Sequence, residues 1–129
     1  MDLLRSDTDE VYALSDEFLI NVTSFFRDPL VYKQLQDVVL PKLFKNRQPD
    51  EQLRVWSVGC TSGEEAYSRG MLLIEQAGSF EDAPSLQIIA SDLHEGSLNK
   101  AREGFYFGDI KSDVSKERLR RFFIKEDGG

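Results

Sequence analysis

The sequence predicts an α/β fold in which helices flank a parallel sheet, as in one half of a doubly wound domain. Two apolar, β-rich runs, LRVWSVG at 53–59 and LQIIASD at 86–92, read as buried strands. Each is followed by a segment with apolar residues at helical spacing, and this alternation is typical of a parallel sheet. Because parallel strands normally have helices on both faces and further neighbours, two strands predict a partial domain.

The first part of the chain is predicted to be helical after a polar lead-in at residues 1–15. Within a helical segment at 16–48, DEFLINVTSFF at 16–26 predicts a short helix. Asp28 is suited to cap a second helix that starts at Pro29, and Pro41 is expected to bend or interrupt it. The expected buried side of this second helix comprises Leu30, Tyr32, Leu35, Val38, Val39, Leu43 and Phe44.

Residues 49–129 carry the predicted α/β unit. A helix is expected at 64–77, with Gly78 as its stop, and another at 94–103, ended by Gly104. The tail SKERLRRFF predicts a further short helix. Three aromatic residues are assigned to the core: Phe25, Phe26 and Trp56. Phe25 or Phe26 could alternatively line a ligand pocket.

Composition excludes several classes of protein. The length of 129 residues fits about one domain, and the net charge of −7 disfavours nucleic acid as a partner. No apolar stretch reaches the ~18 residues of a membrane span, and the acidic start MDLLRSDTDE does not resemble a secretory signal. Cys60 is the only cysteine, which fits a cytoplasmic protein without an internal disulfide.

The loop GCTSG at 59–63 is the candidate binding loop, because ligands of such folds sit at the carboxyl ends of the strands. Gly59 lets the backbone approach a ligand closely. Glu64 and Glu65 then open the next helix, where they would oppose a pyrophosphate. Asp92, at the end of the second strand, is suited to accept both hydroxyls of a ribose.

A ligand with a ribose and positive groups but no phosphate would suit these carboxylates. S-adenosylmethionine has a ribose, a cationic sulfonium and a cationic amino group. The competing interpretation is that Glu64 and Glu65 only complement the helix dipole, and the loop alone leaves both interpretations open. A dinucleotide-binding oxidoreductase is a third possibility, but the loop lacks the full G-x-G-x-x-G pattern.

Longer motifs resemble the CheR family of chemotaxis-receptor glutamate methyltransferases. They are NVTSFFRDP at 21–29, LRVWSVGCTSGEEAYS at 53–68, IIASDLHEGSLNKAREGFY at 88–106 and RLRRFF at 118–123. The resemblance implies a Rossmann-like domain that binds S-adenosylmethionine and releases S-adenosylhomocysteine. It also implies roles for Asn21, Thr23 and Arg27 beside the cofactor and reacting methyl group, for Glu64 on the methionine part, and for Asp92 on the ribose.

The resemblance further implies a reaction: methyl transfer to glutamate side chains of chemotaxis receptors or related signalling proteins. Arg27 is the candidate to orient the incoming carboxylate, although an ion pair with Asp28 or Asp16 would also account for it. No base is needed, which suits a chain whose single histidine, His94, is expected to be exposed near a helix start and not to bind metal.

The sequence departs from the family pattern at His94, Ala66 and Thr61-Ser62, none of which has an assigned role. The family's later strands are missing, so the chain is expected to be the cofactor-binding half, weak or inactive alone. Its lead-in LINVTSFFRDP resembles the branch fused to a receptor-methylesterase domain. Self-association through an exposed sheet edge is expected. A non-catalytic sensor or scaffold that binds the cofactor is the alternative function.

Overall fold

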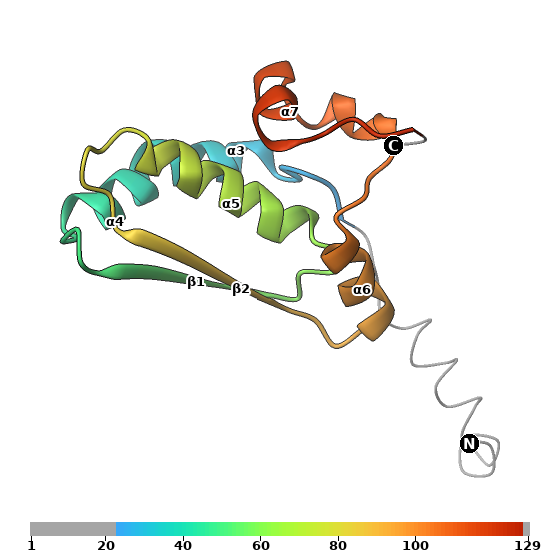
Figure 1. The fold of residues 1–129 in the computed structure, drawn as a ribbon, viewed down its shortest axis with the longest axis horizontal. Helices are drawn as coiled ribbons and strands as arrows, with labels where there is room; N and C mark the ends of the chain where they lie inside the picture. The colour runs from blue at the N-terminus through green and yellow to red at the C-terminus, as the bar shows by residue number, and fades with distance from the viewer. Residues whose placement is uncertain (1–22, 128–129) are drawn as a thin grey trace, which may run out of the picture.

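The computed structural model describes residues 23–127, and its helices lie on one side of a two-stranded parallel sheet (Figure 1). This arrangement confirms the predicted α/β class. Most of the helix expected at 16–26 lies outside the described residues. Residues 23 and 24 have no regular secondary structure and residues 25 and 26 form a turn, so the prediction of a helix is wrong there.

The first described helix is continuous, but it contains a wide turn. It consists of α3 (Pro29–Gln34), a π-helical segment at Leu35–Val39 and α4 (Leu40–Lys45). The N–H of Leu40 donates to the carbonyl of Leu35, five residues back, which is the bond that defines a π turn. Pro41 directly follows this turn, so the proline is accommodated and the helix continues.

The buried side of this helix differs from the predicted one. Tyr32, Leu40 and Phe44 are buried, whereas Leu30 is 83% exposed. The other exposed members of the predicted set are Val38, Val39 and Leu43. The π turn adds about one residue to a helical turn, and this shifts the inward face from positions 38 and 39 to position 40.

The two strands are β1 (Gln52–Val58) and β2 (Ser85–Ser91), paired in register from Gln52 opposite Ser85 to Val58 opposite Ser91. Leu53 and Ser57 of β1 point to the helical side and are buried. On the other face Trp56 is 66% exposed, so its assignment to the core is wrong. No helix among the described residues covers that face, which leaves Val58 and Ile89 exposed as well.

The remaining helices match the predicted order. They are α5 (Glu64–Ala77), α6 (Glu95–Glu103), a 3₁₀ turn at Gly108–Ser112 and α7 (Lys116–Phe122). Gly104 ends α6 with a φ of 64°, the left-handed conformation that glycine adopts without strain. Gly78 follows α5 with an ordinary helical φ of −62°, so the helix stops there without a left-handed cap.

The core lies between the helices and the covered face of the sheet. It comprises Phe25, Phe26, Tyr32, Leu40, Phe44, Leu53, Met71, Leu72, Leu73 and Val114. Phe25 and Phe26 therefore occupy the core as predicted. The C-terminal helix α7 is joined to α5 by Arg118, whose guanidinium contacts both carboxylate oxygens of Glu75 at 2.7 and 3.1 Å.

Candidate functional site

The loop between β1 and α5 has an unusual backbone. Gly59, Thr61 and Gly63 all have a positive φ, of 70°, 53° and 99°. A Cβ on Gly59 would meet no atom within 4 Å, so the backbone there is open to an approaching group. Between them, Cys60 is fully buried, and burial raises the pKa of its thiol. Cys60 is thus a small buried group of the turn.

Asp92 fastens this loop to the end of β2. Its Oδ2 accepts the N–H of Thr61 at 2.9 Å, and its Oδ1 accepts the N–H of His94 at 2.8 Å. The loop is also held by the N–H of Cys60, which donates to the carbonyl of Ser91 at 2.9 Å. A carboxylate offers about four acceptor positions, so Asp92 retains capacity for two further donors such as vicinal hydroxyls.

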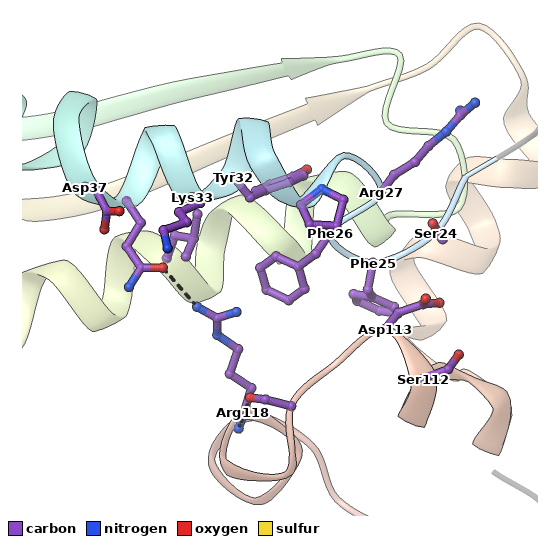
Figure 2. A pocket seen from close by; sticks show the side chains of 14 residues that line it. Ser24, Phe25, Phe26, Arg27, Tyr32, Lys33, Asp37, Ser112, Asp113 and Arg118 are labelled. Atoms are coloured by element: carbon purple, nitrogen blue, oxygen red, sulfur yellow. Dashed lines mark hydrogen bonds between the residues drawn. The ribbon is translucent and has the colours of Figure 1, made fainter.

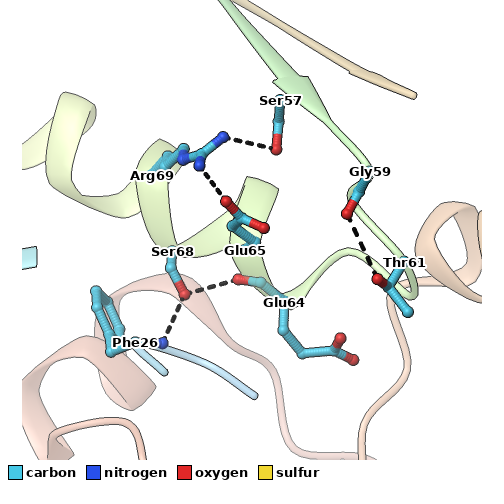
Figure 3. Close-up of polar contacts among 8 residues, drawn as sticks. All are labelled: Phe26, Ser57, Gly59, Thr61, Glu64, Glu65, Ser68 and Arg69. Carbon is cyan, nitrogen blue, oxygen red and sulfur yellow. Dashed lines mark hydrogen bonds and ion pairs between the residues drawn. The ribbon is translucent and has the colours of Figure 1, made fainter. Parts of the chain in front are cut away.

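The two glutamates at the start of α5 have different environments, and their carboxylates point apart in Figure 3. Glu65 forms an ion pair with Arg69, which also donates to Ser57 Oγ at 3.0 Å. Glu64 is only 9% exposed and accepts a hydrogen bond from the Ser62 hydroxyl. A buried carboxylate is stabilised by opposite charge, and Glu64 therefore suits a cationic ligand. Glu65 is engaged within the protein.

Both the positive φ of Gly63 and the close packing around it exclude a side chain at this position. A Cβ there would lie 2.9 Å from the hydroxyl oxygen of Tyr106 and 3.0 Å from both Tyr67 Cε2 and Ala101 Cβ. The Tyr106 hydroxyl donates to the carbonyl of Ser62 at 2.6 Å. Burial, followed by the nearby Glu64 carboxylate, raises the pKa of Tyr106, which keeps its hydroxyl protonated. No sequence pattern singled out Tyr106 as a site residue.

Ser68 joins the N-terminal motif to the first turn of α5 (Figure 3). Its fully buried hydroxyl donates to the carbonyl of Glu64 at 2.6 Å and accepts the N–H of Phe26 at 3.0 Å. Phe26 itself has a φ of 49°, which is uncommon for a residue other than glycine. Ser68 ends the motif at 53–68, but no pattern in the sequence gave it a role.

The predicted residues of the N-terminal motif are placed in part. Thr23 is half-buried, and Asn21 lies outside the described residues. Arg27 is exposed and lines a cavity of about 590 Å³ between the start of α3 and α7. Figure 2 shows its side chain extending away from the side of that cavity where Arg118 lies. Arg118 packs against the Phe26 ring, with its guanidinium carbon 4.4 Å from the ring centroid.

Asp92 lines a different and larger space, a groove of about 1510 Å³ bordered by α5, β2, α6 and the C-terminal segment. Gly59 and Glu64 do not line this groove, and their link to Asp92 is the loop itself, which Asp92 holds through the N–H of Thr61. The motif with Arg27 is connected to them through Phe26 and Ser68, and Arg27 does not line the groove.

His94 is half-buried rather than exposed, because its ring caps α6 by accepting the N–H of Ser97 at 3.1 Å. Within residues 23–127 no group of histidine, cysteine and acidic side chains could hold a metal ion. In the same part of the chain no helix is both long enough and apolar enough to span a membrane.

The two carboxylates, which are hydrogen-bond acceptors, fit a ligand with two hydroxyls at Asp92 and a positive group at Glu64. It does not favour a phosphate, because a buried carboxylate stands at the helix start where a phosphate would bind.

The chain is similar to known methyltransferases over nearly its whole length. Residues 21–129 match the family model described as "CheR methyltransferase, SAM binding domain". An uncharacterized 104.1 kDa protein of Rhodobacter capsulatus is 38% identical over 99% of this chain and 13% of its own length. Chemotaxis protein methyltransferase 2 of Vibrio cholerae is 33% identical, covering 96% of this chain and 43% of that protein.

The chemotaxis protein methyltransferase 2 of Pseudomonas aeruginosa is 35% identical over 84% of this chain and 36% of its own length. The chain thus spans less than half the length of each of these relatives. The 13% share of the R. capsulatus protein is consistent with the expectation that such a segment occurs within larger fusions. The match confirms the predicted family and its cofactor, S-adenosylmethionine. The chain belongs to the CheR methyltransferase family and corresponds to part of its S-adenosylmethionine-binding domain.

Proposed function

We propose that this chain is the cofactor-binding half of a methyltransferase that modifies glutamate side chains of chemotaxis receptors or related signalling proteins. The observation that carries the proposal is the loop after β1, which Asp92 holds through the N–H of Thr61 and which leads directly into the nearly buried Glu64. The family match and the relatives named as chemotaxis protein methyltransferases support the same reaction. A cytoplasmic location follows from such a role.

Each site residue has a distinct task in this proposal. Asp92 would hold the ribose hydroxyls with the acceptor positions left free by the loop amides. Glu64 would hold the positive amino group of the methionine part, inside a site that lowers the effective dielectric and strengthens the attraction. The open backbone at Gly59 would allow close approach of the cofactor. Asn21 and Thr23 would line the methyl group.

When bound, S-adenosylmethionine supplies an electrophilic methyl group that a glutamate carboxylate, with a reference pKa of ~4.3, can accept without losing a proton. The chain's residues then have no proton to move, and their task is positioning. Arg27 would orient the incoming carboxylate, because a guanidinium matches it with two parallel hydrogen bonds. The reaction needs no nucleophile–base pair from the protein.

Calorimetric titration of the 129-residue chain with S-adenosylhomocysteine tests the proposal. We expect saturable binding that weakens at least about tenfold in Asp92→Asn, since one charged hydrogen bond to a ligand contributes about 1.5–3 kcal/mol. The asparagine side chain keeps only one of the two acceptors that Asp92 offers to the N–H groups of Thr61 and His94, so urea unfolding of the variant is measured beside the titration to separate ligand contact from folding. Asp82→Ala, at an exposed position, is the matched control and should bind like the parent.

Binding of NAD in preference to S-adenosylhomocysteine would contradict the proposal and favour a dinucleotide-binding domain. Binding of S-adenosylhomocysteine with no methyl transfer to any glutamate-containing signalling protein, even in the longer parent protein, would favour the sensor alternative. Arg27→Lys distinguishes the two, because only a methyltransferase needs the guanidinium for carboxylate orientation: transfer should fall while cofactor affinity stays close to that of the parent.

A further inference from the structure

The Tyr106 hydroxyl occupies a place that the loop keeps free for it. Gly63 has no side chain, and the position of its absent Cβ lies 2.9 Å from the Tyr106 oxygen. The hydroxyl donates at 2.6 Å to the carbonyl of Ser62, the residue between the two left-handed positions Thr61 and Gly63. The hydrogen bond from Tyr106 thus holds the Ser62 carbonyl, between the left-handed residues Thr61 and Gly63.

The same tyrosine contacts the N-terminal motif through its ring. The rings of Phe25 and Tyr106 meet edge to face, with centroids 4.8 Å apart, and Phe25 is 1% exposed. Tyr106 lies after α6, so a single side chain joins three segments: the C-terminal segment, the loop and the motif that contains Arg27.

We propose that Tyr106 is a positioning residue: its hydroxyl holds the loop in the conformation that directs Glu64 toward the cofactor. Ser62 is the link, because its carbonyl accepts from Tyr106 while its hydroxyl donates to the Glu64 carboxylate at 2.7 Å. Fixing the Ser62 peptide therefore fixes the donor that orients Glu64. The role assigned to Glu64 rests on the proposed function, whereas the hold on the loop does not.

Tyr106→Phe removes the hydroxyl and keeps the ring that packs on Phe25. The chain offers a matched control in Tyr67→Phe, because the Tyr67 hydroxyl also donates to a carbonyl, that of Ala101 at 2.7 Å, but not to the loop. Both variants lose one hydroxyl-to-carbonyl hydrogen bond. Only Tyr106→Phe releases Ser62.

The first measurement is backbone amide hydrogen exchange of the unliganded chains. In Tyr106→Phe we expect faster exchange confined to the loop amides, read at Cys60 and Gly63, with α5 unchanged. Tyr67→Phe should leave the loop at the parental rate. Equal loop exchange in the two variants, or acceleration spread evenly over the whole chain, would overturn the proposal.

The second measurement is the affinity for S-adenosylhomocysteine. A hydrogen bond worth about 0.5–1.5 kcal/mol predicts a loss of roughly twofold to tenfold in Tyr106→Phe and none in Tyr67→Phe. Parental affinity in Tyr106→Phe would overturn the effect on the cofactor while leaving the proposed function intact. If no chain binds the ligand but the loop exchange responds as expected, the proposed function fails and the hold on the loop stands.

Discussion

Ser68 shows how one buried hydroxyl can hold two segments together. It supplies the acceptor for the N–H of Phe26, a residue in a strained left-handed conformation, and has no exposure to water. Ser68→Ala would leave that amide buried without its acceptor. Such a group costs about 1–3 kcal/mol, so urea unfolding should show a loss of that size.

Ser112→Ala is the control for this prediction. The Ser112 hydroxyl donates to the Asp109 carbonyl at 2.9 Å, but at an exposed position where water can replace it. Its free energy of unfolding should stay within about 0.5 kcal/mol of the parent. Equal losses in the two variants would show that Ser68 does not hold the motif.

Two tyrosines with raised pKa values make the free energy of unfolding depend on pH in the alkaline range. Burial is the largest cause that raises the pKa of both Tyr32 and Tyr106 above their ordinary value of 10.0. The folded state therefore keeps protons that the unfolded state loses above about pH 10. The free energy of unfolding should fall above about pH 10 for this reason, and the Cys60 thiol, whose pKa burial also raises, should start the fall above about pH 9.

The measurement is urea unfolding at several values of pH from about 8 to about 11. Tyr106→Phe should reduce the slope above about pH 10, and the remaining slope should come from Tyr32 and Cys60. A slope unchanged by the substitution would assign the alkaline loss to other groups.

The sequence identifies some site residues and not others for a physical reason. Glu64 and Asp92 follow directly after a loop or strand, so their charge and their place in the fold are both readable locally. Tyr106 and Ser68 act through contacts with residues 44 and 42 positions away in the chain. A tyrosine or a serine in the sequence does not predict such a long-range contact, because both residue types also occur widely as ordinary surface or core residues.

At the scale of elements, the π turn decides which face of the first helix is buried. The sequence predicts the helix and its start at Pro29 correctly, but regular 3.6-residue spacing places Leu30 inside and omits Leu40. A π turn contains about one residue more than a regular helical turn, and apolar residues occur on both sides of this helix. The hydrophobic pattern therefore predicts that a helix forms but not which of its faces points to the core.

A pair of leucine substitutions tests the shifted face. Leu40 is 7% exposed and should lose about 2–5 kcal/mol as Leu40→Ala, because a core cavity replaces its side chain. Leu30 is 83% exposed, and Leu30→Ala should change the free energy of unfolding by less than about 0.5 kcal/mol. Thermal or urea unfolding of both variants measures this difference. A larger loss of stability in Leu30→Ala than in Leu40→Ala would show that the face predicted from regular helical spacing is the buried one.

The strands were predictable for a different reason. Apolar β-rich runs bounded by polar loops indicate strands, and the observed bounds agree with those runs to within about one residue. The burial predicted for both strands is wrong for β2, in which no residue is buried. Their environment was not predictable from the runs alone. A parallel sheet normally has both faces covered, and the described residues cover only one.

For the whole molecule, the uncovered face makes association with a second copy the expected behaviour. Trp56, Val58 and Ile89 are 66%, 63% and 49% exposed on it, and each of the two strands has one edge without a strand partner among residues 23–127. Sedimentation velocity should show mass rising with concentration. Ile89→Lys should reduce this association, whereas Leu30→Lys, at an exposed site on α3, should not.

A monomer at every concentration would contradict this prediction. The predicted bounds at 1–15, 16–48 and 49–129 remain predictions. In the described part of the chain, residues from the second and third of these ranges pack into one core. The chain spans less than half the length of these relatives. The sedimentation experiment therefore concerns association of this chain and not the surroundings of the same face in a longer protein.

Trp56 gives the molecule its own optical probe. It is the only tryptophan in the sequence, it stands 66% exposed on the open face, and its indole N–H donates across the strands to Ser91 Oγ at 3.0 Å. Its fluorescence therefore comes from one place, beside the strand end that adjoins Asp92. Emission should start near that of indole in water and shift to shorter wavelength whenever anything covers the sheet, so contact with a partner can be followed by light without attaching a dye.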